Sequence, residues 1–598
     1  DANGGKTLDR PMRTLRAVFD SFDLDLGDRI NVAAGTYLLT NNVVVANQDS
    51  GVTIQGPSGG GAVFNRQNDA SVNGEHAFEL QNADNIAFDS ITVTGAEIGI
   101  YAANGSDSDD LAVRNSQLFG NQLAGILLGF SNDRLSASNN QVYGLPGGST
   151  LDDQTYGISL RDTIDNSGGN DHVIEGNNIF DNSIGLNLTG LRTEARNNQI
   201  HGNSVGIRAY FGASNLSDGL RITDNEIFSN TAQGIDAFGI MTITGNEVYG
   251  HTSTNYAVVA RNATVSGNTI RNNANGLDAN SGTVANNRIF GQSSIGLNLA
   301  SSFSGVQVVD SNSVYSNSIG IRGASNFTNV VITNNLVYAN INRGLLFENS
   351  SAGANVVYVW NNTIYQQVGD AVRLQSSARN IKLSNNIITI LSGYAINVDN
   401  TSQTGFSSDY NVFQLSADPN ARVGFWNSDC DTLVIWQSGS SGDVNSLSAD
   451  PLFIDINGAD NRFGYSGGID GGADDNFYRL KNSPATDRGD SWNSTYLDRD
   501  QIAPSDDLGV MNAGRLTLTP NVLASNQFTA TGMAQPSWRS NNFSFSYTFA
   551  GGFTFPFFGT AYSSVNVSTE GFLQFGPAVD TGDGNNSISS LVTRPRIA

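Results

Sequence analysis

The chain has 598 residues, of which 55 are acidic and 31 are basic, giving a formal net charge of −24 at pH 7. Nucleic acids and anionic membranes are bound through clustered Lys and Arg, so neither is expected as a partner. No run of about 18 apolar residues occurs, and direct membrane insertion is therefore not expected. Cys430 is the only cysteine, which excludes an intramolecular disulfide framework.

The N-terminal residues lack both an initiator Met and a signal peptide. The chain begins at Asp1, so we expect that a preceding segment was removed. Few Lys, 66 Gly, many Asn and Ser and a strong acidic balance together favour an extracellular setting in which calcium is available. We assign residues 1–29 to an N-terminal cap.

A sequence repeat follows this cap and dominates the chain. Each copy has an Asn pair, a variable residue, a β-branched residue or Leu, often an aromatic residue, and later Gly followed by Ile or Leu. Fourteen equivalent positions span 322 residues, a mean interval of about 25 residues. The assigned positions are Asp89, Asn115, Asn140, Asn178, Asn198, Asn225, Asn246, Asn268, Asn287, Asn312, Asn335, Asn362, Asn386 and Asn411.

The period and the short alternating apolar runs predict three short strands per repeat and leave no room for a helix of ordinary length. Leucine-rich repeats have a similar period, but their Leu frame is missing. The sequence therefore predicts an all-β fold, a right-handed parallel β-helix over residues 30–420. An Asn side chain can donate and accept between coils, so the repeated Asn residues are interpreted as scaffold. The long interval between Asn140 and Asn178 predicts a projecting loop.

The N-terminal motifs Gly27-Asp28-Arg29-Ile30 and Ala33-Ala34-Gly35-Thr36-Tyr37 resemble the opening of bacterial β-helix proteins of the pectate-lyase-like superfamily. The resemblance spans residues 1–420 and implies a capping helix within 11–26, followed by a first strand at 30–32. This superfamily includes lyases, epimerases, glycoside hydrolases, phage spikes and adhesins. It therefore implies a fold and not a reaction.

Two further regions follow the repeat. Residues 421–515 are predicted to close the helix with acidic loops; Ala449 to Phe453 and Ser483-Pro484-Ala485 resemble the terminal segment of secreted, surface-anchored bacterial proteins. Residues 516–598 contain Phe553 to Gly559 and Val565 to Leu573, which resemble a nidogen-like extracellular β-module. We expect the chain to end inside this small module.

The strand after each Gly gives a candidate binding face. If Ile207 and Leu297 point inward, the following residues Arg208 and Asn298 point outward, and the same holds in every coil. This outward row is a candidate surface for a polysaccharide or another surface protein. An ordinary solvated sheet face with ion pairs between coils is the alternative. The candidate glycan-facing residues are Arg208, Tyr210, Asp236, Asp278 and Arg322.

Two acidic loops carry oxygen ligands and Gly turns of the kind that calcium accepts, although the twelve-residue EF-hand spacing is absent. Calcium is therefore the expected cofactor, with a solvated acidic loop as the alternative. The candidate ligands are Asp455, Asn457, Asp460, Asp470, Asp474 and Asp475. Among the histidines, His201 occupies a position held by aromatic residues in sibling repeats and is expected to pack, whereas His172 is the less constrained candidate base.

These features favour an extracellular structural or adhesive protein of a bacterial cell surface or appendage. The alternative is a polysaccharide lyase or C5-epimerase, in which a base removes a proton and cations neutralise the uronate. The signature motifs of pectate lyases, polygalacturonases and alginate epimerases are absent from the sequence. No catalytic residue is assigned.

Overall fold

A computed structural model describes residues 4–7, 9–67, 74–145, 153–160, 169–210, 219–300, 306–324, 327, 329–349, 356–480, 482–486 and 489, together with six short strands between 544 and 597. The predicted loop between Asn140 and Asn178 falls largely on residues 146–152 and 161–168, outside the described residues. The chain divides into two compact units, Asp1–Arg515 and Leu516–Ala598.

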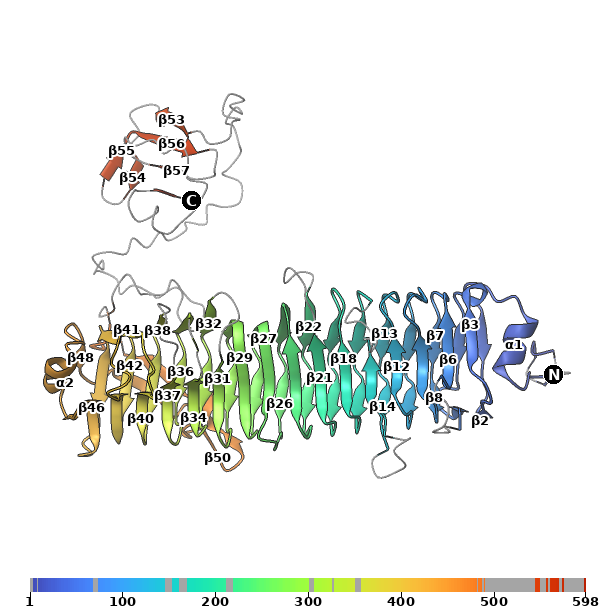
Figure 1. Ribbon diagram of the computed structural model, residues 1–598, viewed down its shortest axis with the longest axis horizontal. Helices are drawn as coiled ribbons and strands as arrows, with labels where there is room; N and C mark the ends of the chain where they lie inside the picture. Colours follow the sequence, from blue (N-terminus) through green and yellow to red (C-terminus); the bar gives the residue numbers. More distant parts are fainter. Residues whose placement is uncertain are drawn as a thin grey trace. The chain divides into compact units, whose positions relative to one another are not determined.

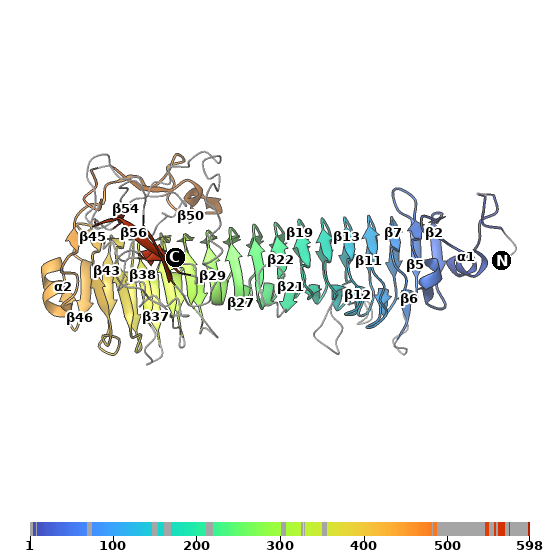
Figure 2. The ribbon, with the colours of Figure 1, turned by 90° about the horizontal axis from the view of Figure 1, so that it is seen from above.

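The first unit is a parallel β-helix in which each coil contributes one strand to each of three sheets (Figures 1 and 2). The predicted fold class is thus confirmed. The first sheet contains β1 (Arg29–Asn31), β4 (Thr53–Gln55), β7 (Ala87–Asp89), β10 (Ala112–Arg114), β13 (Ser136–Ser138), β16 (Val173–Glu175), β19 (Glu194–Arg196), β22 (Leu220–Thr223), β25 (Met241–Thr244), β32 (Gln307–Asp310), β35 (Val330–Thr333), β38 (Val357–Trp360), β41 (Ile381–Ser384) and β44 (Ser407–Asp409).

The second sheet contains β2 (Gly35–Leu38), β5 (Ala62–Asn65), β8 (Ile91–Thr94), β11 (Gln117–Phe119), β14 (Gln141–Tyr143), β17 (Asn178–Phe180), β20 (Gln199–His201), β23 (Glu226–Phe228), β26 (Glu247–Tyr249), β28 (Thr269–Arg271), β30 (Arg288–Phe290), β33 (Ser313–Tyr315), β36 (Leu336–Tyr338), β39 (Thr363–Gln366), β42 (Ile387–Ile390), β45 (Val412–Leu415) and β48 (Leu447–Ser448).

The third sheet contains β3 (Val43–Ala46), β6 (His76–Gln81), β9 (Ile98–Ala102), β12 (Ala124–Leu128), β15 (Tyr156–Ser159), β18 (Ile184–Leu188), β21 (Val205–Tyr210), β24 (Gln233–Phe238), β31 (Ile295–Leu299), β34 (Ile319–Gly323), β37 (Arg343–Glu348), β40 (Asp370–Gln375), β43 (Gly393–Val398) and β46 (Ala421–Trp426). Two longer strands, β27 (Tyr256–Ser266) and β29 (Asn275–Ala285), run from the third sheet into the first.

The register of the third sheet is the predicted one. Ile207 and Leu297 are fully buried, and Arg208 lies on the outer side of the same strand with its side chain partly exposed. Asn298 is also outward-facing, and its amide donates to Asp278 on the preceding coil. Residues paired from coil to coil reproduce the whole predicted outward row, namely Tyr101, Leu127, Ser159, Asn187, Arg208, Asp236, Val259, Asp278, Asn298, Arg322, Leu346, Arg373 and Asn397.

The glycine before each inward Ile or Leu has a steric cause. A Cβ atom on Gly206 would lie 2.6 Å from the carbonyl oxygen of Gly234 on the next coil. A side chain at this position would therefore push neighbouring coils apart.

The repeated Asn residues form a buried ladder at the corner between the first and second sheets. The Asn268 amide donates to Oδ1 of Asn287 at 2.9 Å and to the carbonyl of Ile243, and Asn287 Oδ1 also accepts from the Asn268 backbone N–H. The residue just before the ladder Asn takes the sharp turn, as Asn286 does with φ 57°. In pairs such as Asn286-Asn287, a left-handed corner residue is therefore followed by a ladder residue.

Three of the predicted ladder positions were wrong. The ladder passes through Asn177 and not Asn178, which is the first residue of β17. It passes through Ser116 and not Asn115, whose φ of 53° makes it the corner residue. Asp89 pairs in register with Arg114 and lies two residues before the ladder. The Asn repeat in the sequence does not by itself show which residue of each corner has the left-handed backbone and which belongs to the ladder.

A second polar ladder lies at the corner between the second and third sheets, in most coils five residues after the first ladder. The Asn182 amide donates to Asn203 Oδ1 at 2.9 Å, and Asn203 repeats the contact to Asn230 at 3.0 Å. His251 replaces the Asn of its coil, so its ring lies between Asn230 and Asn273. The ladder runs through Asn121, Gln154, Asn182, Asn203, Asn230, His251, Asn273, Gln292, Asn317 and Asn340.

Both ends of the hydrophobic core are covered. At the N-terminal end, α1 (Leu15–Ser21) is capped by Thr14, and its buried Leu15 joins the core. At the C-terminal end, α2 (Leu433–Ser440) inserts Trp436, which is fully buried and donates to Asp443 at 2.7 Å. The strand β47 (Asp429–Cys430) pairs antiparallel with β46 and ends the coil stack. The helix within residues 11–26 is thus present but shorter than that range.

Residues 449–480, which we call the strap, return along the outer side of the second sheet (Figure 2). Aromatic side chains of the strap pack on Phe290, Tyr315, Tyr338 and Tyr365. The strap contains the strand pairs β49 (Phe453–Asp455) with β52 (Asn476–Arg479) and β50 (Tyr465–Ser466) with β51 (Ile469–Asp470). It is thus a segment folded onto the completed solenoid.

The second unit has antiparallel strands where it is described. These are β53 (Ser544–Thr548), β54 (Phe555–Phe557), β55 (Thr560–Tyr562), β56 (Ser564–Ser568), β57 (Leu573–Gln574) and β58 (Arg596–Ile597). In the described parts of the chain, no helix has the length and apolarity to cross a membrane.

Candidate functional site

The outer side of the third sheet carries a row of mostly polar side chains, which Leu127, Val259 and Leu346 interrupt. Tyr210 and Asp236, both predicted, lie on neighbouring coils, and the Tyr210 hydroxyl donates to Asp236 Oδ2 at 2.6 Å. Two guanidinium groups flank the same carboxylate: Arg208 Nε lies 3.9 Å from Oδ2, and Arg261 Nη1 lies 3.5 Å from Oδ1. Arg261 was missed by the sequence interpretation, although it stands two residues after Val259 as Tyr210 stands two after Arg208.

Asp278, another predicted residue, lies one coil beyond Val259 in the same row. Asn298 donates to its Oδ1 at 2.6 Å. Burial raises the pKa of Asp278, and the hydrogen bond from Asn298 and the charge of Arg261 oppose that shift. Burial also raises the pKa of nearby Tyr256 to about 12, with the Asp278 charge adding to the shift and Arg322 opposing it. The structure therefore brings Asp278 and Arg322 to one neighbourhood around Tyr256.

The row continues toward the C-terminal coils. The predicted residue Arg322 forms an ion pair with Glu348 at 2.9 Å, and Glu348 accepts a 2.6 Å hydrogen bond from Gln375. Asp370 lies 3.5 Å from Arg373 and accepts from Asn397 at 3.1 Å. Acidic and basic side chains both occur along the row and beside it, so this face presents both donors and acceptors.

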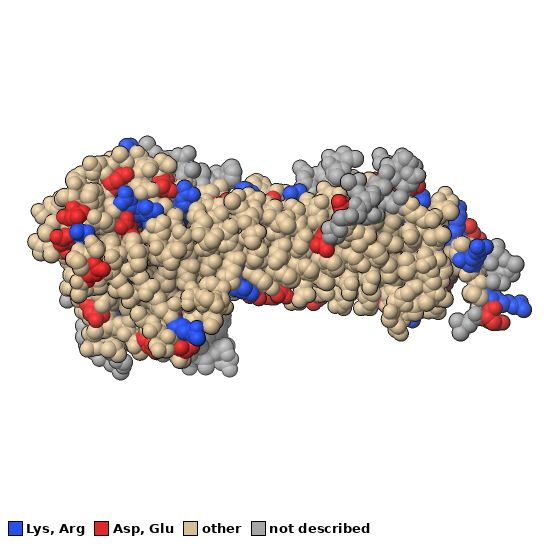
Figure 3. Space-filling view, turned by 90° about the horizontal axis from the view of Figure 1, so that it is seen from below, with Lys and Arg blue, Asp and Glu red and all other residues tan. Residues whose placement is uncertain are grey.

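Figure 3 shows a related feature of the first unit from below. The middle of the solenoid is almost free of charged side chains in this view, whereas Lys, Arg, Asp and Glu are intermixed over the C-terminal coils. Charge is thus concentrated at particular places on an otherwise neutral polar surface.

The phenol groups of this face are hydrogen-bond donors at neutral pH. Burial and the hydrogen bond to Asp236 raise the pKa of Tyr210, so its phenol stays protonated at neutral pH and serves as a donor. Tyr256 behaves in the same way. Asp236 already contacts a phenol and two guanidinium groups.

The acidic loops of the strap are mostly committed to protein contacts. Asp470 binds Arg288 and accepts from the Tyr315 hydroxyl at 2.7 Å. Asp474 Oδ2 accepts from the Asp460 backbone N–H at 3.1 Å, and Asp475 Oδ2 accepts from that of Gly464 at 2.8 Å. Asp455 accepts from the Asn457 N–H at 3.3 Å.

Across the described ranges, no group of three or more His, Cys, Asp or Glu residues is arranged to hold a metal ion. The six predicted ligands are therefore not gathered into one cluster. Calcium binding by the strap stays a prediction.

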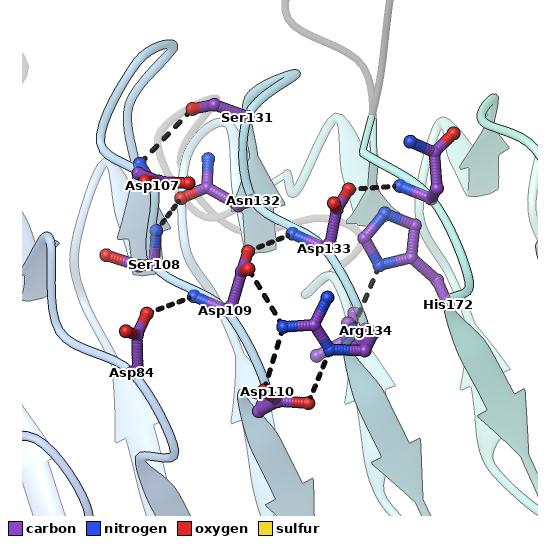
Figure 4. Close-up of polar contacts among 12 residues, drawn as sticks. Asp84, Asp107, Ser108, Asp109, Asp110, Ser131, Asn132, Asp133, Arg134 and His172 are labelled. Atoms are coloured by element: carbon purple, nitrogen blue, oxygen red, sulfur yellow. Dashed lines mark hydrogen bonds and ion pairs between the residues drawn. The ribbon is translucent and has the colours of Figure 1, made fainter.

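A third cluster, drawn in Figure 4, lies at the corner between the third and first sheets. Asp109 donates its backbone N–H to Asp84 Oδ1 at 2.9 Å and accepts that of Asp133 at 2.8 Å. Arg134 bridges Asp109 and Asp110, with contacts at 2.9 and 2.8 Å. These carboxylates satisfy turn backbones and one guanidinium, which is a structural role.

His172 and His201 are packing residues. His172 was expected to be the less constrained candidate, but it is fully buried and accepts the Leu135 N–H at 3.0 Å. Burial lowers the pKa of His172 to about 4. The expected packing of His201 is confirmed, since its ring stacks between those of Phe180 and Phe228.

Three family models match the chain. A model described as right handed beta helix region matches residues 214–358, and one described as periplasmic copper-binding protein (NosD) matches residues 35–239. A model described as NIDO related matches residues 522–598, the region that resembles a nidogen-like module.

Among curated proteins, the uncharacterized protein YwoF of Bacillus subtilis strain 168 is 27% identical over 161 residues. The match covers 25% of this chain and 34% of YwoF, so the chain spans about a third of that relative.

Similar solved structures include DFA-IIIase from Arthrobacter chlorophenolicus A6 in complex with GF2, at 15% identity and TM-score 0.31, covering 62% of this chain and 85% of that one. The A-module of a mannuronan C-5 epimerase from Azotobacter vinelandii has 13% identity and TM-score 0.27, covering 67% and 98%. A tailspike protein of E. coli bacteriophage HK620, in complex with pentasaccharide, has 10% identity and TM-score 0.29, covering 71% of each chain. At this level of similarity, these structures say nothing about the activity of this chain.

Proposed function

We propose that this right-handed parallel β-helix repeat protein acts outside the cytoplasm as a structural or adhesive protein that binds a polysaccharide along its third sheet. The observation that carries the proposal is the outward row from Arg208 to Asn397, in which guanidinium, carboxylate and amide side chains recur on a regular scaffold and only Val259 and Leu346 are apolar. With about 4.8 Å between coils, the row is roughly 38 Å long. That length suits an extended polymer better than a single small molecule.

The chemistry of the row supports this ligand class. Sugar hydroxyls both donate and accept, so they match a surface of guanidinium, carboxylate, amide and phenol groups. The partners of Asp236 hold its carboxylate in a fixed orientation before any ligand arrives, which lowers the entropic cost of binding. An extracellular or periplasmic location fits the absence of clustered Lys and the family models that match the repeat.

A binding test compares the wild-type protein with the Arg208→Ala variant on a panel of neutral and acidic polysaccharides. The variant should keep its thermal stability, because the Arg208 side chain is outward and partly exposed, and should bind at least tenfold more weakly. Arg114→Ala is the matched control, since Arg114 is also outward and ion-paired, but on the first sheet. Equal binding by all three proteins, or no binding to any polymer, would contradict the proposal.

The competing reading, a polysaccharide lyase or C5-epimerase, is tested with the same polymers. A lyase would release unsaturated uronate, which absorbs in the ultraviolet, and an epimerase would change the uronate composition seen by NMR. We expect neither change after prolonged incubation. Turnover that is lost in Arg208→Ala would replace the binding proposal with an enzymatic one.

A further inference from the structure

A second outward row, independent of the proposed glycan-binding row, runs along the second sheet. At the last position of each short strand, paired residues follow one another from coil to coil, and nearly all are aromatic. This aromatic ladder consists of Phe119, Tyr143, Phe180, His201, Phe228, Tyr249, Arg271, Phe290, Tyr315, Tyr338 and Tyr365.

The rings of the ladder lie face to face. Tyr143 and Phe180 have centroids 4.7 Å apart with planes inclined by 6°, and Phe180 and His201 are 5.2 Å apart and parallel. The guanidinium of Arg271 continues the stack 4.0 Å from the Tyr249 centroid. Because neighbouring rings occupy each other's faces, the outer surface of the ladder is made of ring edges.

The strap covers one half of this ladder. Phe463 contacts Tyr338 and Tyr365 with ring planes inclined by 56° and 64°, and Tyr465 contacts Phe290 at 52°. In these contacts the strap rings are tilted against the edges of the ladder rings. Aromatic pairs favour such tilted or edge-to-face arrangements because of their ring quadrupoles. As a result, Tyr315 is fully buried and Phe290 and Tyr338 are 1% exposed.

The other half, from Phe119 to Tyr249, has no such cover among the described residues. Its six rings are all partly exposed, and their described ring contacts are with one another and with Arg271. Beside the rings lies a polar row that includes Gln141, Gln199 and Glu226. The same ladder is therefore a completed interface at one end and an open one at the other.

We propose that the open half of the ladder, Phe119 to Tyr249, docks a polypeptide segment of a partner protein that carries aromatic side chains. The strap shows how such a segment covers this surface, and the open half continues it in the same register. A sugar ring stacks on an aromatic face, and these faces are already occupied. Six coils span about 24 Å, which an extended segment of roughly seven residues would cover.

The experiment uses the whole chain and a fluorescein-labelled peptide with the sequence of residues 461–479, which includes Phe463, Tyr465 and Phe477. The chain's own strap occupies the covered half, so peptide added in solution reports on the open half. We expect saturable binding by fluorescence anisotropy. A peptide with all three aromatic residues replaced by Ser should not bind.

Phe180→Ser and Phe228→Ser are two independent ladder variants, each expected to weaken peptide binding at least tenfold. Phe238→Ser is the matched control, because Phe238 is 46% exposed on the third sheet. Thermal unfolding verifies that each variant is folded. Absence of peptide binding to wild type, or binding that both ladder variants retain, would overturn the proposal. Competition by a polysaccharide that the Phe180→Ser variant no longer binds would replace the polypeptide partner with a glycan.

Discussion

The hydroxyl of Tyr210 and the carboxylate of Asp236 come from successive coils and meet at 2.6 Å on the outside of the third sheet. The contact depends on the register that pairs Arg208 with Asp236, because it places Tyr210 and Asp236 on the same face. With Arg208 and Arg261 on either side, one carboxylate contacts three residues, and the four side chains come from three strands. This arrangement makes Asp236 the most informative position to change.

Asp236→Asn keeps the shape of the side chain and a hydrogen-bond acceptor for Tyr210, but it removes the negative charge between two guanidinium groups. Partly exposed ion pairs contribute about 0.2–1 kcal/mol, so we expect a small loss of stability. Polysaccharide binding should fall at least tenfold because the guanidinium groups lose their common partner. Calorimetric titration and thermal unfolding measure the two effects. A large loss of stability with unchanged affinity would mean that the row is only structural.

Asn268→Ala tests the buried ladder. The Asn268 amide donates to Asn287 and to two carbonyl groups, and its oxygen accepts from Asn246. Removal leaves several buried groups without partners, at about 1–3 kcal/mol each, so the midpoint of denaturant unfolding should fall strongly. Gln199→Ala, on the exposed surface of the second sheet, should change it little. Equal effects of the two substitutions on the unfolding midpoint would show that the buried ladder contributes no more to stability than an exposed side chain does.

His251→Asn tests the acid sensitivity of the second ladder. Burial lowers the pKa of His251 to about 4, below the ordinary value of 6.5, so the unfolded chain binds the extra proton first. Above pH 6.5, His251 is neutral in both states and causes no loss of stability. As the pH falls to 4, the free energy of unfolding decreases by about 3 kcal/mol because only the unfolded chain readily protonates this side chain. Asn, the residue of neighbouring coils, should reduce that decline. Unfolding midpoints of the wild type and of His251→Asn are measured between pH 7 and 4. An equal loss of stability in the two proteins would refute the role of His251 in acid sensitivity.

Calcium should stabilise the strap if its carboxylates share a cation. Burial raises the pKa of Asp475 to about 6, and the charges of Asp474 and Asp460 add to that shift, so a cation would relieve the repulsion among them. We expect calcium to slow protease cleavage within residues 449–480 and a chelator to reverse this protection. Asp460→Asn combined with Asp474→Asn should remove the response. Identical cleavage rates with and without calcium would end the proposal of a calcium site.

The sequence predicts the repeating architecture well because every coil repeats the same physical constraints. The Gly before Ile207 and the alternation of Arg208 and Ala209 determine which side chains face inward, and one correct coil predicts all the others. The second ladder also had a usable signal, since Asn198 and Asn203, like Asn225 and Asn230, are five residues apart. The sequence interpretation did not assign this second ladder, and His251 breaks its Asn pattern.

Contacts between distant segments could not be predicted in this way. Nothing in the repeat indicates that Tyr465 packs on Phe290 or that Asp470 bonds to Tyr315, because those contacts form only when the strap folds back. Loop composition likewise does not reveal which strap carboxylates accept backbone hydrogen bonds, as Asp474 and Asp475 do. The neighbourhood of Tyr256 likewise depends on side chains from several coils.

The most direct test of the binding proposal is hydroxyl-radical footprinting with and without the polysaccharide that binds most tightly. Aromatic residues report on each face: Tyr210 and Phe238 on the third sheet, and Phe228 and Tyr249 on the second. The account predicts that ligand protects Tyr210 and Phe238 while Phe228 and Tyr249 react as before. Protection of Phe228 and Tyr249 instead, or no protection of Tyr210, would contradict it.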